Sequence, residues 1–154
     1  MLQGMAIGDL AKLLLEAGAL RDAAITAERL TPLHLASLSD HIDIVQLLIK
    51  ARTDKEKRQN NGQTPLAIAA ERSNLEIACL LIQASADTDK AQADGTTALV
   101  IAAERSSLQI VRLLIEARAD TEKAKKDGTT SLGIAAAKSK VEIIRLACQL
   151  KLNW

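Results

Sequence analysis

The feature that most constrains the fold of this chain is a set of residues that recurs every 33 positions. Four such series run through the sequence: Thr31, Thr64, Thr97 and Thr130; Leu33, Leu66, Leu99 and Leu132; Ala36, Ala69, Ala102 and Ala135; and Leu47, Leu80, Leu113 and Leu146. A fixed period of this length indicates a stack of small, similar units and not a single globular core. The recurring positions are expected to build the stack, and the varying positions are free to face a partner.

The composition restricts both the core and the partners. Trp154 is the single aromatic residue although 48% of the chain is hydrophobic, so the core must consist of aliphatic side chains that suit closely packed helices. The net charge of +1, from 20 basic and 19 acidic residues, gives no overall attraction to nucleic acid or to an anionic membrane. No apolar run reaches the length of a membrane span. We therefore expect neither nucleic acid nor a membrane as a partner.

Each unit is predicted to form two short helices. Thr64-Pro65 indicates a helix start, because a Thr side chain can cap free N–H groups and Pro is tolerated at the first helical position. Ser73-Asn74 interrupts the helical spacing of apolar residues, and a second, more apolar helix is predicted from Leu75 to Ile82. Residues 88–95 are polar and return the chain to the next unit. Helices this short do not persist alone in water, so stacking must supply the missing burial.

This pattern resembles the ankyrin repeat. The resemblance is carried by Thr31-Pro32-Leu33-His34-Leu35-Ala36, Ile42-Asp43-Ile44-Val45-Gln46-Leu47-Leu48, Asp94-Gly95-Thr96-Thr97 and Ala119-Asp120. It covers about the whole chain and implies an all-α solenoid of stacked helix-turn-helix units with β-turn-like connecting loops.

The resemblance also implies how the chain is divided. We expect one domain over 1–154, with an N-terminal half-repeat or cap at 1–20 and repeats at 26–58, 59–91 and 92–124. The fourth repeat, which is also the C-terminal cap, is expected at 125–154, with Trp154 covering its last helix. Within the half-repeat, residues 7–19 are expected to form a helix.

The chain lacks several glycines that the family pattern places at helix ends. Arg52, Ser85 and Arg118 follow the second helices, and Asp40, Ser73, Ser106 and Ser139 follow the first helices. Arg29 replaces the turn glycine that is present as Gly62, Gly95 and Gly128. If the left-handed backbone is kept, each residue that follows a second helix should cost on the order of 1 kcal/mol relative to Gly. The sequence therefore predicts lower stability than a glycine-complete array.

No catalytic, metal or cofactor motif is present in the sequence. Gly4, Gly8 and Gly18 fit neither nucleotide-binding pattern, and the two histidines, His34 and His41, lack Cys or His partners at zinc spacing. We interpret His34 as a structural residue at a helix start. A nucleophile pair of Cys79 with His41 stays open, although nothing in the sequence favours it. We therefore expect a protein that is not an enzyme and that needs no cofactor.

The two cysteines do not form a disulfide framework, and free thiols indicate a cytoplasmic or other reducing compartment. Repeat positions predict that Cys148 is buried, since it aligns with Ile49, Ile82 and Ile115, and that Cys79 is exposed.

Charged residues also recur along the predicted stack. Acidic rows (Asp54, Asp87 and Asp120; Glu56, Asp89 and Glu122) run beside a lysine row (Lys57, Lys90 and Lys123). We expect these rows to pair with each other across repeats; the alternative is a basic stripe for nucleic acid or an acidic peptide. The last repeat is locally basic (Lys123, Lys125, Lys126, Lys138 and Lys140), which could mark the end that meets an acidic partner.

The family resemblance implies that a protein partner binds the concave surface formed by the turn tips and the outward side of the first helices. Carried over position by position, the candidate residues are Glu28, Leu30, Leu38, Ser39, Asn60, Asn61, Gln63, Glu71, Arg72, Ala93, Asp94, Thr96, Glu104, Arg105, Lys126, Asp127, Thr129, Ala137 and Lys138. Leu30 and Leu38 are apolar at exposed-type positions; they either anchor a partner or pack against the unusual first loop. Few residues here are of the types that dominate binding hot spots, and the surface partly repeats between units, so weak, polar or absent binding is expected.

We interpret the chain as a non-enzymatic protein-interaction module. The alternative is a designed or reconstructed scaffold with no natural ligand, because Ile68-Ala69-Ala70-Glu71-Arg72-Ser73 is repeated as Ile101-Ala102-Ala103-Glu104-Arg105-Ser106. Recent duplication in a natural array would give the same pattern. We expect a monomer, with end-to-end association through the N-terminal helix as the other possibility.

Overall fold

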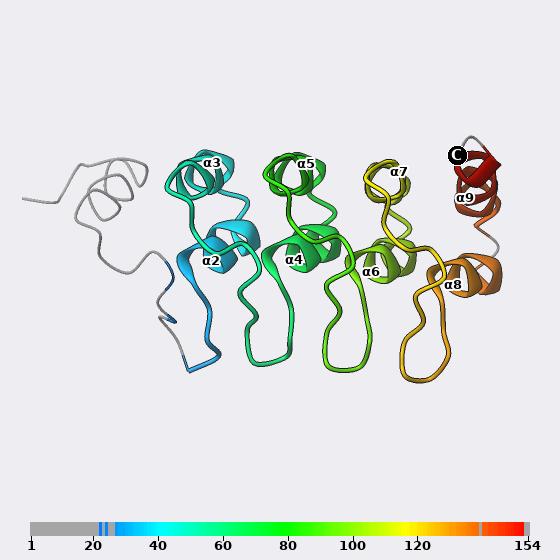
Figure 1. Ribbon diagram of the computed structural model, residues 1–154, viewed down its shortest axis with the longest axis horizontal. Helices are drawn as coiled ribbons and strands as arrows, with labels where there is room; N and C mark the ends of the chain where they lie inside the picture. The colour runs from blue at the N-terminus through cyan, green and yellow to red at the C-terminus, as the bar shows by residue number, and fades with distance from the viewer. Residues whose placement is uncertain (1–21, 23, 25–26, 139, 153–154) are drawn as a thin grey trace, which may run out of the picture.

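The computed structural model describes residues 22, 24, 27–138 and 140–152, and these residues contain eight α-helices arranged in four pairs. The first helices of the pairs are α2 (Pro32–Leu38), α4 (Pro65–Arg72), α6 (Ala98–Arg105) and α8 (Ser131–Ala137). The second helices are α3 (Ile42–Lys50), α5 (Leu75–Gln83), α7 (Leu108–Glu116) and α9 (Val141–Leu152). Figure 1 shows the pairs side by side, with the first helices in one layer and the second helices in the other. The predicted all-α ankyrin-type solenoid is thereby confirmed.

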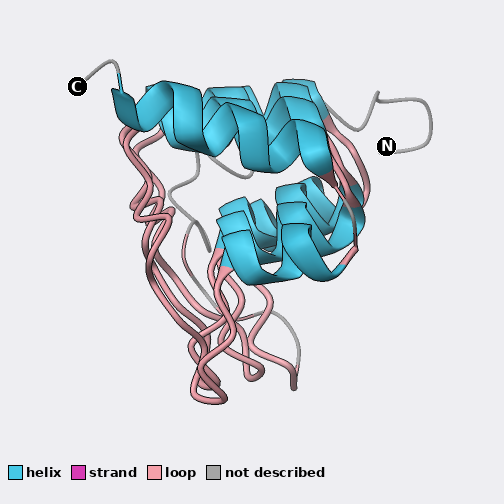
Figure 2. Cartoon of the chain, turned by 90° about the vertical axis from the view of Figure 1, so that its right-hand side faces the viewer, coloured by secondary structure: helices cyan, strands magenta, loops and turns pink. Residues whose placement is uncertain are grey.

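Long loops join each pair to the next and project away from both helical layers (Figure 2). The described residues contain no β-strand, only an isolated bridge between Ala124 and Thr130. The helix predicted for residues 7–19, the cap predicted for 1–20 and the placement of Trp154 lie outside the described residues.

The first helices begin where the sequence predicts. Thr64, Thr97 and Thr130 each accept a hydrogen bond on their side-chain oxygen from the backbone N–H three residues later. Thr31 does the same and is additionally bonded to the ring of His34. Each cap satisfies an N–H group that the helix itself leaves free. The Thr series is thus explained by helix initiation.

Small and aliphatic side chains fill the space between repeats. Leu33, Leu66 and Leu99 are at most 2% exposed, and Ala69 and Ala102 are fully buried. Because the first helices carry Ala where they meet, neighbouring helices can approach closely without aromatic residues. One continuous core therefore runs along the stack, as the repeat period requires.

Residues other than glycine occupy the left-handed backbone region at most of the positions where the family pattern has Gly. The φ angles lie between 56° and 67° at Arg29, Asp40, Arg52, Ser73, Ser85, Ser106 and Arg118. The left-handed backbone conformation is present at these positions although the glycines are missing, so each of them carries backbone strain.

The predicted pairing of acidic and lysine rows is wrong at Glu56 and Asp89. The Glu56 carboxylate accepts a hydrogen bond from the backbone N–H of Asp87 (2.9 Å), and that of Asp89 accepts one from the N–H of Asp120 (2.8 Å). Lys123 donates to the backbone carbonyl of Asp89 (2.6 Å). The side chains of Glu56, Asp89 and Lys123 thus connect their repeats to the backbone of a neighbouring repeat. They provide hydrogen-bond partners for backbone groups in the loops.

The two cysteines also differ from their predicted exposure. Cys148 is exposed and Cys79 is half-buried; both thiols are free. Of the isoleucines at the same repeat position, Ile115 is 4% exposed, whereas Ile49 and Ile82 are half-buried. The repeat position therefore does not by itself determine the burial of Cys148.

Candidate functional site

A groove of about 580 Å³ lies between the loops and the first helices of the second, third and fourth repeats. Its wall is formed by Gln63, Glu71, Gln92, Asp94, Thr96, Ile101, Glu104, Arg105, Lys125, Ile134, Ala137 and Lys138. The lining is mostly polar and charged, with two isoleucines at its base that are 6% and 8% exposed. We take this groove as the candidate site because it is the concave surface on which the predicted positions converge.

The loops hold one wall of the groove through tight turns that stack on one another. In the third repeat the backbone N–H of Gln92 donates to the carbonyl of Thr96 (2.8 Å) across Gly95, which has a φ of +89°. A Cβ at Gly95 would lie 3.0 Å from the Cα of Lys125 in the next turn. Glycine is therefore required here for its backbone angle and for the close approach of the following loop.

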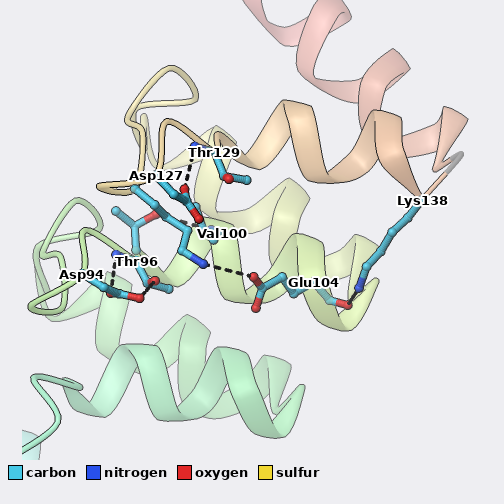
Figure 3. A network of polar contacts seen from close by, with 9 residues as sticks. Asp94, Thr96, Val100, Glu104, Asp127, Thr129 and Lys138 are labelled. Carbon is cyan, nitrogen blue, oxygen red and sulfur yellow. Dashed lines mark hydrogen bonds and ion pairs between the residues drawn. The ribbon is translucent and has the colours of Figure 1, made fainter.

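Aspartates in the turns are fixed by their own loops, as Figure 3 shows. The Asp94 carboxylate accepts hydrogen bonds from the Thr96 backbone N–H (2.9 Å) and hydroxyl (2.7 Å), and Asp127 accepts one from the Thr129 N–H (2.8 Å). The threonine bonds are the largest cause of the lowered pKa of each aspartate, and the positive charge of Lys125 lowers both further. Both carboxylates therefore stay ionised in more acidic solution than a free aspartate does.

Lysines of the fourth repeat reach back to the third. Lys125 Nζ lies 3.7 Å from the Glu104 carboxylate, and its side chain is only 20% exposed. Lys138 donates to the backbone carbonyl of Glu104 (2.6 Å), and both residues line the groove (Figure 3). At 3.7 Å the Lys125 contact is an ion pair without hydrogen-bond geometry.

The near end of the groove is held by a polar chain across two repeats. The Glu71 carboxylate accepts a hydrogen bond from Gln63 Nε2 (2.8 Å) and pairs with Arg105 of the next repeat (3.0 Å). The second and third repeats are thereby tied together on the groove side, and the polar wall is organised before any partner binds.

His34 has the structural role that the sequence predicts. Its Nδ1 lies 2.7 Å from the Thr31 hydroxyl and accepts from the Thr31 backbone N–H (3.2 Å), while Nε2 lies 3.3 Å from the carbonyl oxygen of Gln63. These partners fit the neutral imidazole with its proton on Nε2. Burial lowers the pKa of His34, although hydrogen bonds to backbone carbonyls act in the opposite direction.

The sequence profile of the family described as "Ankyrin repeats (3 copies)" matches residues 2–92 and 84–153. The chain belongs to the ankyrin-repeat family. A comparison with curated proteins finds no match. Ankyrin repeats are generally protein–protein interaction modules.

Eight of the residues predicted to contact a partner line the groove of this ankyrin-repeat chain: Gln63, Glu71, Asp94, Thr96, Glu104, Arg105, Ala137 and Lys138. Seven other predicted positions are exposed and lie outside the groove lining: Glu28, Ser39, Asn60, Asn61, Arg72, Lys126 and Asp127. Thr129 is half-buried. The groove therefore contains the central residues of the predicted surface, whereas the residues at the edges of that surface lie outside the groove.

Leu30 is not the exposed anchor that its repeat position suggested. It is 7% exposed, and Thr96, which has the same repeat position, is 6% exposed. Gln63 and Thr129, at the same repeat position, are half-buried, so burial varies between repeats; Leu30 itself is not an exposed anchor. Leu38 is half-buried and keeps an accessible apolar edge.

Four groove residues were missing from the predicted surface: Gln92, Ile101, Lys125 and Ile134. Gln59, Gln92 and Lys125 share one repeat position, and Ile68, Ile101 and Ile134 share another. The change from Gln to Lys in the fourth repeat was the sequence signal that could have identified Lys125.

The described residues do not assemble a metal site or a nucleophile pair. No group of three or more potential metal-binding side chains occurs among them, and no hydrogen bond joins His41 to Cys79 within that part of the chain. None of the described helices is long and apolar enough to cross a membrane.

Proposed function

We propose that this ankyrin-repeat chain is a non-enzymatic interaction module that binds a protein partner in the groove between its loops and first helices. The observation that carries the proposal is the prearranged polar wall, in which Glu71, Asp94 and Glu104 each have a partner inside the protein. A surface that is already ordered does not lose conformational freedom when it binds, so more of the contact energy appears as affinity.

The proposed contact surface comprises the groove-lining residues together with the exposed predicted positions beside them. Arginine is the one residue type present that is common in binding hot spots, and aromatic anchors are absent from the groove. We therefore propose a polar, moderate-affinity interaction by a monomeric protein, and we place it in a reducing compartment because both described cysteines are free thiols.

A scaffold without a natural ligand is the competing interpretation. It is favoured by the recurrence of Glu71-Arg72 as Glu104-Arg105, because a surface selected for one ligand generally differs between repeats. The fourth repeat has Ala137-Lys138 at the same positions, so the face is not uniform, which favours a real partner.

The proposal is tested by affinity capture from cell lysate with the natural chain and with Arg72→Glu/Arg105→Glu. The matched control is Lys50→Glu/Arg112→Glu, which makes the same change in charge at exposed positions on α3 and α7. We expect a protein to be retained by the natural chain and the control and lost from the groove variant, with equal helical circular dichroism for all three. Capture of nothing specific by any of them would favour the scaffold interpretation.

A further inference from the structure

One arginine beside the groove lacks the carboxylate that its repeat-equivalent has. Arg105 pairs with Glu71 of the preceding repeat at 3.0 Å. Moving both positions back by one repeat gives Arg72 and Leu38, so an apolar side chain stands where the carboxylate would be. Arg72 is exposed and forms no ion pair with any described residue.

The opposite end of the same row has a second cation that forms no ion pair with any described residue. Lys138 takes the repeat position of Arg105 and Glu104 that of Glu71, but Lys138 Nζ donates to the backbone carbonyl of Glu104 (2.6 Å), and the Glu104 carboxylate lies 3.7 Å from Lys125 instead. An ammonium group has three donors, so two remain for other acceptors. Lys125, close by, has only the loose 3.7 Å contact with Glu104.

We propose that the groove, together with Arg72 and Leu38 beside it, binds an acidic segment of a protein partner, with one carboxylate on Arg72 and a second at Lys138. This proposal rests on the proposed function and specifies the chemistry of the partner. Arginine binds carboxylates in a bidentate geometry, and the accessible edge of Leu38 favours an apolar residue beside the first acid. Between the two ends, Arg105 is already neutralised by Glu71, so the middle of the segment needs no charge.

The spacing of the two cations sets the spacing of the acids. Arg72 and Lys138 are two repeats apart, and packed helices lie about 8–10 Å apart, which gives a separation of roughly 16–20 Å. An extended chain covers about 3.3–3.6 Å per residue, so the carboxylates should be about five or six residues apart. A nucleic-acid strand has a phosphate about every 3.4 Å and would place charges against Glu71 and Glu104, which argues for a peptide.

A selection from a random peptide-display library on the full chain tests the proposal. Peptides enriched by the natural chain should carry Asp or Glu at the predicted separation, with an apolar residue beside the first acid. A synthetic version of the best peptide should lose at least tenfold in affinity when its acids become Asn or Gln. Lys50→Glu/Arg112→Glu should bind it as the natural chain does.

The sharpest variant is Leu38→Glu, which supplies the missing carboxylate without altering either cation. It should pair with Arg72 as Glu71 pairs with Arg105 and should weaken the acidic peptide at least tenfold, with unchanged circular dichroism and thermal unfolding. Arg72→Glu/Lys138→Glu should weaken it further. Peptides that bind the groove without acidic preference, or that ignore Leu38→Glu, would overturn this inference and leave the proposed function standing. No enrichment over bare support, or binding insensitive to every groove variant, would overturn both.

Discussion

The imidazole of His34 connects the first repeat to the second. Its Nε2 lies 3.3 Å from the carbonyl oxygen of Gln63, 29 residues later in the chain, while Nδ1 accepts from the backbone N–H of Thr31. The ring is fully buried, so both bonds are made without competition from water. Gln63 in turn donates to Glu71, which connects this histidine to the polar wall of the groove.

The buried His34 should make the protein less stable in mildly acidic solution. Its pKa is lowered from 6.5 in the folded protein, so the unfolded chain binds the proton more readily. Stability is therefore complete above about pH 6.5 and declines as the pH falls below that value. Urea unfolding between pH 8 and pH 5 should show this decline, and His34→Ala should remove it while costing about 1–3 kcal/mol at pH 7 through lost buried hydrogen bonds.

The histidine effect can be separated from that of the aspartates. Asp94 and Asp127 have pKa values lowered from 3.8, so their contribution is present above that pH and is lost only in more acidic solution. Position 34 is equivalent to Ala67, so alanine is already accepted at this place in the repeat. An unchanged slope between pH 7 and pH 5 in His34→Ala would contradict the assignment.

The fold was predictable because each helix carries its own local signals. Thr64 followed by Pro65 specifies a helix start by capping alone, and the left-handed ends after the second helices were expected at Ser85 and its equivalents. These features depend on neighbours within one repeat, so a single sequence contains them.

The groove was only partly predictable because it depends on neighbouring repeats. Lys125 enters the wall by reaching back to Glu104, and Glu56 bonds to a backbone N–H one repeat later. A sequence shows that these residues are charged but not which way their side chains extend, nor whether a backbone group or an opposite charge is nearer. For Leu30 the sequence left two readings open, an exposed anchor or a packed side chain, and its exposure of 7% excludes the exposed anchor.

Restoring a glycine after a second helix should stabilise the protein. Ser85 has a φ of +64°, a strained angle for any residue with a Cβ. Ser85→Gly should raise the free energy of unfolding by about 0.5–1 kcal/mol, after allowance for the greater freedom of glycine in the unfolded chain. Urea unfolding at pH 7 measures the change. Ser85→Ala keeps the strain and should give no gain; an equal gain from both would point to the serine hydroxyl.

Two glycines in equivalent turns should respond differently to the same substitution. Gly95 and Gly128 have similar φ angles of +89° and +82°, but an added Cβ meets the Lys125 backbone at 3.0 Å only in the former. Gly128→Ala should cost about 1–2 kcal/mol through backbone strain. Gly95→Ala should cost roughly 1–3 kcal/mol more, because the next loop must move away. Thermal unfolding of both variants measures the difference, and equal losses would show that the turns do not stack closely in solution.

The ion pair between Glu71 and Arg105 should contribute little to stability. Both side chains are substantially exposed, 38% and 53%, so water and salt screen their attraction. A double-mutant cycle with Glu71→Gln and Arg105→Gln should give a coupling of about 0–1 kcal/mol that decreases between 0.05 M and 1 M salt. The main effect of this ion pair is to neutralise Arg105, so that Arg72 is the arginine beside the groove that can bind a carboxylate of a partner. A coupling well above 1 kcal/mol that is insensitive to salt would mean that the Glu71–Arg105 pair is shielded from solvent. Arg105 would then differ from the exposed Arg72 in burial as well as in having a carboxylate partner.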